Sequence, residues 1–134
     1  YQAFGPELVD RLEKAVERTA GNTRLTLVIA LNYGSRAEIA AAARKLAERA
    51  VAGEIAATDV DEARIESELQ TRELPPLDLL IRTSGEVRLS NFLLWQAAYA
   101  ELLFLDIMWP DFDETMFADA LGQFAARQRR FGGR

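Results

Sequence analysis

The stretch LDLLIRTSGEVRLSNFLLWQAAYAELLFLDIM, Leu77–Met108, contains two short apolar runs separated by a polar loop and an apolar segment. The first run, Leu77–Ile81, follows two consecutive prolines, which break any preceding helix. The second run is Leu102–Met108. Short apolar runs bounded by turn residues are typical of strands that are buried on both faces. The stretch therefore predicts two strands joined through an apolar helix around residues 92–98.

The rest of the chain carries helical periodicity and one more apolar run. Ser35 followed by Glu38 is a capping-box pattern, and it opens an alanine-rich helix that extends to about Ala52. The other predicted elements are a helix from Pro6 to Thr19, a buried strand at Leu25–Leu31, a short helix within 54–73 and a last helix from an Asp113 cap to Arg130.

Strands that alternate with helices predict an α/β fold, in which a parallel sheet is flanked by helices. We expect residues 1–134 to form a single α/β domain. Three strands buried on both faces are few for such a sheet, and their edges would invite pairing. We therefore expect further strands or a partner subunit to cover this sheet.

Composition narrows the possible chemistry. The 134 residues include 16 basic and 21 acidic side chains, a net charge of −5, so we expect no nucleic-acid partner. The chain has no cysteine and no histidine, which excludes thiolate nucleophiles, imidazole bases and the usual zinc sites. The sequence shows no signal-peptide pattern and no membrane-spanning run, so we expect a cytoplasmic protein. Because the chain starts at Tyr1, we also expect a longer protein.

The loop from Arg82 to Ser90 leaves the carboxyl end of a predicted strand, where open α/β sheets bind ligands. Arg82, Arg88 and small hydroxyl residues, followed by the start of a helix, are parts of a diphosphate-binding site. An alternative stays open from the residues alone. In it the arginines pair with Glu86 and other surface carboxylates, and Ser90 or Asn91 is only a helix cap.

Four other features are weaker candidates. Glu101 precedes an apolar strand and either holds magnesium beside a diphosphate or is an exposed acid at a strand end. The segment 32–36 either faces a ligand or forms a turn and a helix cap. Trp95 and Trp109 are interpreted as core or interface residues. The C-terminal arginines complement the dipole of the last helix.

Three segments resemble a known family in the same order. DLLIRTSGEVRLSNFLLWQAAYAELLFLDIMWPDFDETMFADAL, Asp78–Leu121, is similar to the C-terminal half of the cis-prenyltransferases, in particular the bacterial undecaprenyl diphosphate synthases. TAGNTRLTLVIALNYGSR, Thr19–Arg36, and RRFGG, Arg129–Gly133, resemble the same family. The resemblance covers nearly the whole chain.

The resemblance implies an enzyme that joins isopentenyl diphosphate to an allylic diphosphate, such as farnesyl diphosphate, with cis geometry. It further implies magnesium as cofactor, a polyprenyl lipid carrier for cell-wall synthesis as product, and transient membrane association through that lipid. Arg82, Arg88 and Ser90 would hold the diphosphate of isopentenyl diphosphate, and Leu89 would line the same loop. Guanidinium groups suit this role because they bind dense anions through charge-assisted hydrogen bonds.

The family pattern also implies roles outside the loop. Glu101 matches the family's acidic, metal-associated position. Arg130 and Gly132 match a terminal Arg-x-Gly motif, which in this family reaches across a homodimer to the partner's active site. Val87 stands where well-known bacterial members carry a histidine, and its side chain cannot bind a metal.

The family's N-terminal half has no counterpart in this sequence. That half carries the allylic-diphosphate segment, a magnesium-binding aspartate and most of the hydrophobic tunnel. We therefore assign no catalytic residue here and expect the chain alone to be inactive. The alternative function is a non-catalytic dimerisation subunit of a heteromeric cis-prenyltransferase. The complete set of Arg82, Arg88 and Ser90 favours the enzyme, because a scaffold needs no diphosphate site.

Overall fold

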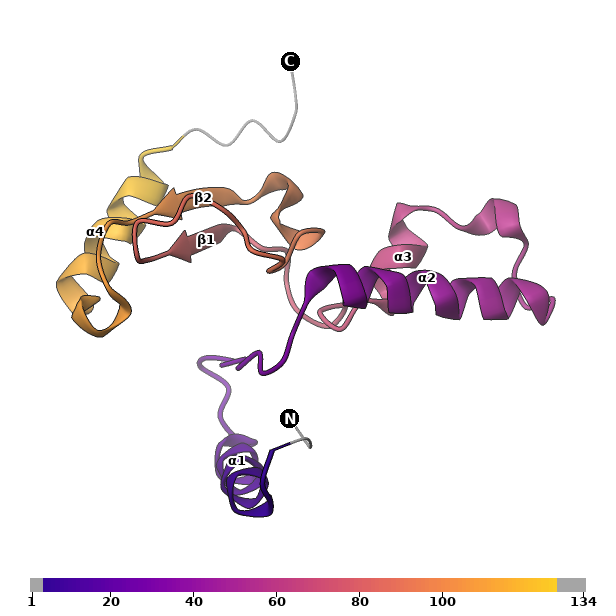
Figure 1. Ribbon diagram of the computed structural model, residues 1–134, viewed down its shortest axis with the longest axis horizontal. Helices are drawn as coiled ribbons and strands as arrows, with labels where there is room; N and C mark the ends of the chain where they lie inside the picture. The colour runs from indigo at the N-terminus through magenta and orange to yellow at the C-terminus, as the bar shows by residue number, and fades with distance from the viewer. Residues whose placement is uncertain (1–3, 128–134) are drawn as a thin grey trace. The chain divides into compact units, whose positions relative to one another are not determined.

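The computed structural model describes residues 4–127 and divides the chain into two compact units, the first ending at Tyr33 and the second beginning at Gly34 (Figure 1). The prediction of one domain for residues 1–134 stays a prediction.

The first unit contains helix α1, Pro6–Thr19, as predicted. Proline in the first turn, Glu7 near the start and Arg18 in the last turn all suit a helix and its dipole. Lys14 pairs with Asp10 one turn earlier at 2.7 Å, and such pairs add local stability. No residue of α1 is buried, so local interactions hold this helix.

The predicted strand at Leu25–Leu31 is wrong. The structure assigns no strand to these residues, and the apolar side chains of residues 25–30 are exposed, with Leu25 at 79% and Ile29 at 62%. A strand requires a neighbour that bonds its backbone, and no described residue provides one for this run. The apolar pattern indicates that this run is normally buried, but nothing in the described part of the chain buries it.

The second unit begins with α2, Ser35–Val51, as predicted. A turn, η1 (Ala57–Asp59), leads to α3, Glu62–Glu68, which runs beside α2 (Figure 1) and confirms the predicted short helix. Ala42 and Leu46 on α2 and Leu69 after α3 are almost completely buried. Arg49 of α2 bonds Glu68 at 3.0 Å at the edge of this contact.

Ser35 and Glu38 do not form the predicted capping box, although both are buried. The Ser35 hydroxyl accepts a hydrogen bond from the backbone N–H of Leu94 at 3.0 Å. The Glu38 carboxylate accepts one from Gln70 N–H at 2.8 Å and another from Gln96 Nε2 at 3.2 Å. A buried carboxylate must be hydrogen-bonded, and here its donors come from two distant segments instead of its own helix start.

The sheet is parallel, as predicted, and has two strands among the described residues, β1 (Leu79–Arg82) and β2 (Glu101–Phe104). Leu79 lies opposite Glu101, and Arg82 lies opposite Phe104. Leu80 and Leu103 are the buried residues of the two strands. Both strands are shorter than predicted, because ladder hydrogen bonds, and not apolar character, set where a strand ends.

The predicted helix around residues 92–98 is also wrong, since only the short 3₁₀ helix η2, Gln96–Tyr99, forms there. Asn91 and Leu93 have positive φ angles of 66° and 48°. This left-handed backbone cannot continue into a right-handed α-helix. The chain therefore reaches β2 through turns that keep the Leu94 N–H available to Ser35.

After β2 the 3₁₀ helix η3, Trp109–Asp111, leads to α4, Glu114–Ala125. Asp113 caps α4 as predicted, because its carboxylate accepts a hydrogen bond from Met116 N–H at 2.9 Å. The helix ends at Ala125 and not at Arg130, which lies outside the described residues. The guanidinium of Arg127 turns back to the Leu102 carbonyl at 2.9 Å. Among residues 4–127, no helix has the length and apolar character needed to cross a membrane.

We predict that Glu38→Ala destabilises the protein by about 2–4 kcal/mol, because it leaves buried donors of Gln70 and Gln96 without their acceptor. Glu48→Ala, an exposed position on the same helix, is the matched control. Urea unfolding followed by circular dichroism measures both variants. Equal stabilities of the two variants would show that the buried contacts of Glu38 contribute nothing.

Candidate functional site

The loop that carries the predicted diphosphate-binding residues leaves the carboxyl end of β1 and is fixed at its start. Ser84 N–H donates to the Ile107 carbonyl at 2.7 Å, and Gly85 N–H donates to the Leu105 carbonyl at 3.0 Å. A Cβ added to Gly85, whose φ is +67°, would lie 2.8 Å from Asp106 Oδ1. Glycine is therefore required where the loop passes the segment after β2.

The end of the loop is fixed to the N-terminus of α2. The Asn91 backbone carbonyl accepts from Ser35 N–H at 2.9 Å, and its side-chain Oδ1 accepts from Arg36 N–H at 2.8 Å. Asn91 is therefore a cap, but of α2 and not of a following helix. These bonds use the N–H groups of Ser35 and Arg36, so the segment 32–36 acts as a turn and helix start here. The helix start expected to receive an anion after the loop is also absent from the described residues.

Arg82, the last residue of β1, hydrogen-bonds to two residues at the far end of the loop. Its Nη1 donates to the Ser90 hydroxyl oxygen at 2.8 Å and also to the backbone carbonyl of Arg88. Because the Ser90 oxygen accepts this bond, its own O–H remains able to donate to another acceptor. Arg82, Arg88 and Ser90 therefore meet in one cluster, and their predicted binding of a diphosphate stays a prediction.

Glu86 belongs to the same cluster. Its Oε2 forms an ion pair with Arg88 Nη1 and lies 3.9 Å from Arg82 Nη2. The alternative from the sequence, in which both arginines pair with Glu86, thus describes the geometry correctly. It does not exclude anion binding, because two guanidinium groups around one carboxylate leave a positive charge at the loop.

Two neighbours in the loop differ in burial. Leu89 is half-buried, whereas Val87 is exposed at 74%. Left-handed φ angles occur at Ser84 and Ser90, both non-glycine residues. Such strain persists only where surrounding contacts over-determine the backbone, and it concentrates at functional sites. The bonds at both ends of the loop supply that constraint.

Glu101 lies at the other end of the sheet. It pairs with Leu79 across the parallel strands, three residues before Arg82, which places it about 10 Å from the loop along the strand. Its carboxylate forms an ion pair with Arg127 at 2.9 Å. Within residues 4–127, no group of three or more acidic side chains is arranged to hold a metal ion. The described residues therefore do not fit a complete magnesium site. The roles predicted for Arg130 and Gly132 fall outside the described residues.

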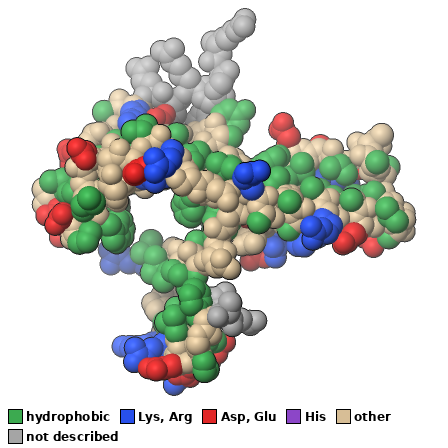
Figure 2. Space-filling model, viewed as in Figure 1, with side chains coloured by type: hydrophobic (Ala, Val, Ile, Leu, Met, Phe, Trp, Pro, Cys, Tyr) green, Lys and Arg blue, Asp and Glu red, His purple; other side chains and the backbone are tan. Residues whose placement is uncertain are grey.

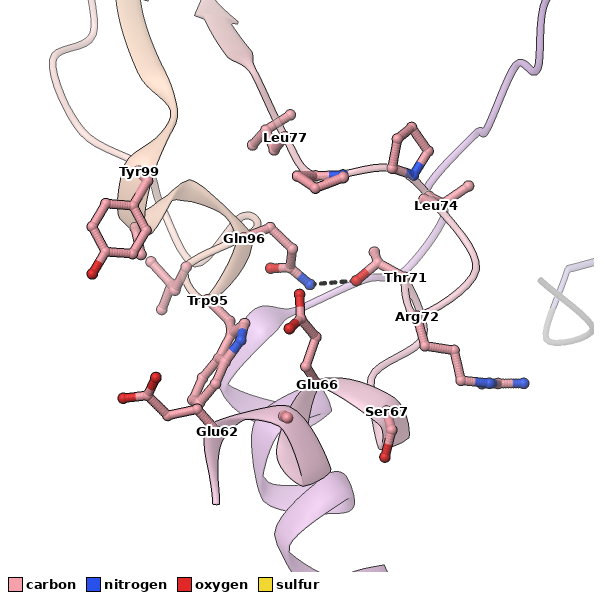
Figure 3. A pocket seen from close by; sticks show the side chains of 15 residues that line it. Glu62, Glu66, Ser67, Thr71, Arg72, Leu74, Leu77, Trp95, Gln96 and Tyr99 are labelled. Carbon is pink, nitrogen blue, oxygen red and sulfur yellow. Dashed lines mark hydrogen bonds between the residues drawn. The ribbon is translucent and has the colours of Figure 1, made fainter. Parts of the chain in front are cut away.

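A pocket of about 920 Å³ lies apart from the loop, between the α3 region and the η2 segment (Figure 3). Gln96 Nε2 donates to Thr71 Oγ1 at 2.7 Å in its wall, and Trp95 and Tyr99 also line it. None of the predicted site residues lines this pocket. The sequence pattern did not predict a role for Gln96, whose only signal is a single amide within an otherwise apolar run.

A comparison with protein families finds a match to almost the whole chain. A family model described as "Putative undecaprenyl diphosphate synthase" matches residues 1–132. An isoprenyl transferase of Zymomonas mobilis is 54% identical over 133 residues, which are 99% of this chain and 54% of that protein. A farnesyl-diphosphate-specific ditrans,polycis-undecaprenyl-diphosphate synthase of Haemophilus ducreyi is 55% identical over 97% of this chain and 54% of that protein. The chain spans about half the length of the curated relatives it matches.

Solved structures of prenyl diphosphate synthases are also similar to this chain. Lavandulyl diphosphate synthase from Lavandula x intermedia, crystallised with dimethylallyl diphosphate, superposes with a TM-score of 0.88 at 37% identity over 98% of this chain and 56% of that chain. A probable undecaprenyl diphosphate synthase from Campylobacter jejuni gives a TM-score of 0.74 at 29% identity, over 98% of this chain and 59% of that chain. The α/β fold class and the family resemblance are thereby confirmed, and the chain belongs to the undecaprenyl diphosphate synthase family of cis-prenyltransferases.

Proposed function

We propose that the protein containing this chain is an undecaprenyl diphosphate synthase. It condenses isopentenyl diphosphate with farnesyl diphosphate in cis geometry, and this chain binds the isopentenyl diphosphate. The observation that carries the proposal is the convergence of Arg82, Arg88 and Ser90 at the carboxyl end of β1. Relatives named for farnesyl-diphosphate-specific synthesis support the choice of reaction.

In this proposal the loop binds and orients and performs no bond-making step. Arg82 Nη1 is committed to Ser90 and to the Arg88 carbonyl, which leaves Arg82 Nη2 and the Arg88 guanidinium to grip phosphate oxygens. The Ser90 O–H adds a neutral donor, and Leu89 lines the same loop. The condensation breaks the allylic carbon–oxygen bond, forms a carbon–carbon bond and releases diphosphate and a proton. We assign no catalytic residue for these steps to this chain.

The proposal includes magnesium dependence, which rests on the chain's membership of this family. Glu101 is the residue we assign to the metal. Its single carboxylate is paired with Arg127, so it can contribute only together with ligands beyond the described residues. The metal would supply electrostatic stabilisation of diphosphate oxygens.

We also propose that the protein forms a homodimer and that Arg130 and Gly132 serve the partner's site. Figure 2 shows hydrophobic side chains exposed over the part of the second unit that carries α4. Trp109 stacks on Phe112 with ring centroids 5.9 Å apart, yet Trp109 is 71% exposed. Tyr99, Met108 and Phe117 are exposed as well. Apolar surface of this kind marks interaction sites.

A non-catalytic dimerisation subunit is the second candidate function. The same exposed aromatic residues favour it, because they serve a dimer whether or not the site binds substrate. The ordered arrangement of Arg82 with Ser90 favours the enzyme, since a scaffold would not need it. Binding of isopentenyl diphosphate separates the two candidates.

We predict that Arg82→Ala weakens isopentenyl diphosphate binding by about tenfold to a hundredfold, because it removes a charge-assisted donor and releases the loop. Arg88→Ala should weaken it less, since Arg88 is 64% exposed against 25% for Arg82. Isothermal titration calorimetry on the purified chain measures both.

Arg72→Ala is the control for these variants, since Arg72 is an exposed arginine that pairs with its neighbour Glu73. Ser90→Ala should have the smallest effect of the loop substitutions, because it removes one neutral donor. Unchanged binding in Arg82→Ala would remove the loop from the site.

The 134-residue chain alone should not elongate farnesyl diphosphate, because the sequence has no counterpart of the family's allylic-diphosphate segment. Incorporation of labelled isopentenyl diphosphate in the presence of magnesium tests this, with a full-length relative as positive control. A polyprenyl product identified by mass spectrometry would contradict the expectation.

For the dimer, we predict that Trp109→Asp shifts the protein from dimer to monomer at micromolar concentration, since it places a charge in an apolar contact. Val51→Asp introduces the same charge at a residue that is 91% exposed at the end of α2, and should leave the dimer intact. Sedimentation velocity measures both variants. A monomeric wild-type protein would refute the proposed assembly.

A further inference from the structure

Glu86 is the one member of the loop cluster for which the proposed function has no use. Its Oε2 faces Arg88 Nη1 and Arg82 Nη2. This oxygen is buried, and within the described residues no hydrogen-bond donor outside this ion-pair cluster reaches it. The two guanidinium groups therefore neutralise Glu86, and Glu86 in turn holds their charges together in the loop.

The cluster has two sets of contacts, the hydrogen bonds of Arg82 Nη1 and the ion pairs of Glu86. Arg82 Nη1 bonds Ser90 and the Arg88 carbonyl, and these bonds do not involve Glu86. The Glu86 side chain is 35% exposed, and that of Arg88 is 64% exposed, so solvent reaches part of both side chains. If Glu86 swings away, Arg82 keeps its position and its Nη2 becomes available to another anion.

A carboxylate oxygen between two guanidinium groups makes the same kind of contact as a phosphate oxygen between them. We propose that Glu86 is an internal counter-anion, which occupies the anion position of Arg82 and Arg88 until a diphosphate displaces it. The inference rests on the proposed function and adds a residue that lowers diphosphate affinity. Without Glu86, two like charges would repel each other in the loop and an arriving diphosphate would meet no competitor.

The first test is titration of the purified chain with inorganic pyrophosphate by calorimetry. Glu86→Gln keeps the side-chain shape and removes the competing charge, so it should bind about three- to tenfold more tightly than wild type. Its binding should also weaken more steeply with added salt, because its loop carries one more net positive charge. Glu73→Gln, the same substitution at an exposed acid paired with Arg72, is the matched control and should bind like wild type.

The second test uses the wild-type chain, and so does not depend on a variant that folds. Glutamate labelled with ¹³C at the carboxyl carbon gives a Glu86 resonance, assigned by its absence in Glu86→Asp. Saturating pyrophosphate should move this resonance to the position of a solvent-exposed carboxylate.

The outcomes separate the two claims. Wild-type protein that does not bind pyrophosphate, or an Arg82→Ala variant that binds it equally well, overturns the proposed function of the loop. If Arg82→Ala weakens binding but Glu86→Gln binds no more tightly than wild type, the counter-anion role is overturned and the loop assignment stands. An unmoved Glu86 resonance at saturation also overturns the counter-anion role.

Discussion

The buried polar contacts of Ser35 and Glu38 hold the second unit together. Both side chains lie on the first turn of α2, and they accept hydrogen bonds from Leu94, Gln70 and Gln96. A buried carboxylate without donors would be strongly unfavourable, so these contacts act as directional constraints as well as a source of stability. They fix the segment after the loop and the segment after α3 to one end of a single helix.

The geometry of the candidate site follows from that constraint. Asn91, three residues before Leu94, is placed where it caps α2, and this closes the end of the loop. The sheet fixes the start of the loop, because Arg82 is the last paired residue of β1 and the Gly85 N–H bonds the backbone after β2. A loop fixed at both ends holds its arginines in place before any ligand binds, which lowers the ordering entropy lost on binding.

The electrostatics of the loop are balanced within the loop itself. Arg82 and Arg88 face Glu86 at short range, while the chain as a whole carries a net charge of −5. Any attraction of this chain for a diphosphate would therefore have to come from the loop itself, because the net charge of the whole chain is negative. At the other end of the sheet, Arg127 neutralises Glu101, so Glu101 and the loop arginines are separated along the strands.

The sequence by itself determined the three helices before the sheet, the parallel direction of its strands, the Asp113 cap and the grouping of Arg82, Arg88 and Ser90 in one loop. These depend on local periodicity, capping and position at a strand end, all of which neighbouring residues encode. Only the tertiary structure decided that Leu25–Leu31 has no strand partner among the described residues, that Ser35 and Glu38 bond distant segments, and that residues 92–98 turn instead of forming an α-helix. Packing selects hydrogen-bond partners that lie dozens of residues apart in the sequence. A local pattern indicates only that a residue requires burial or a hydrogen-bond partner.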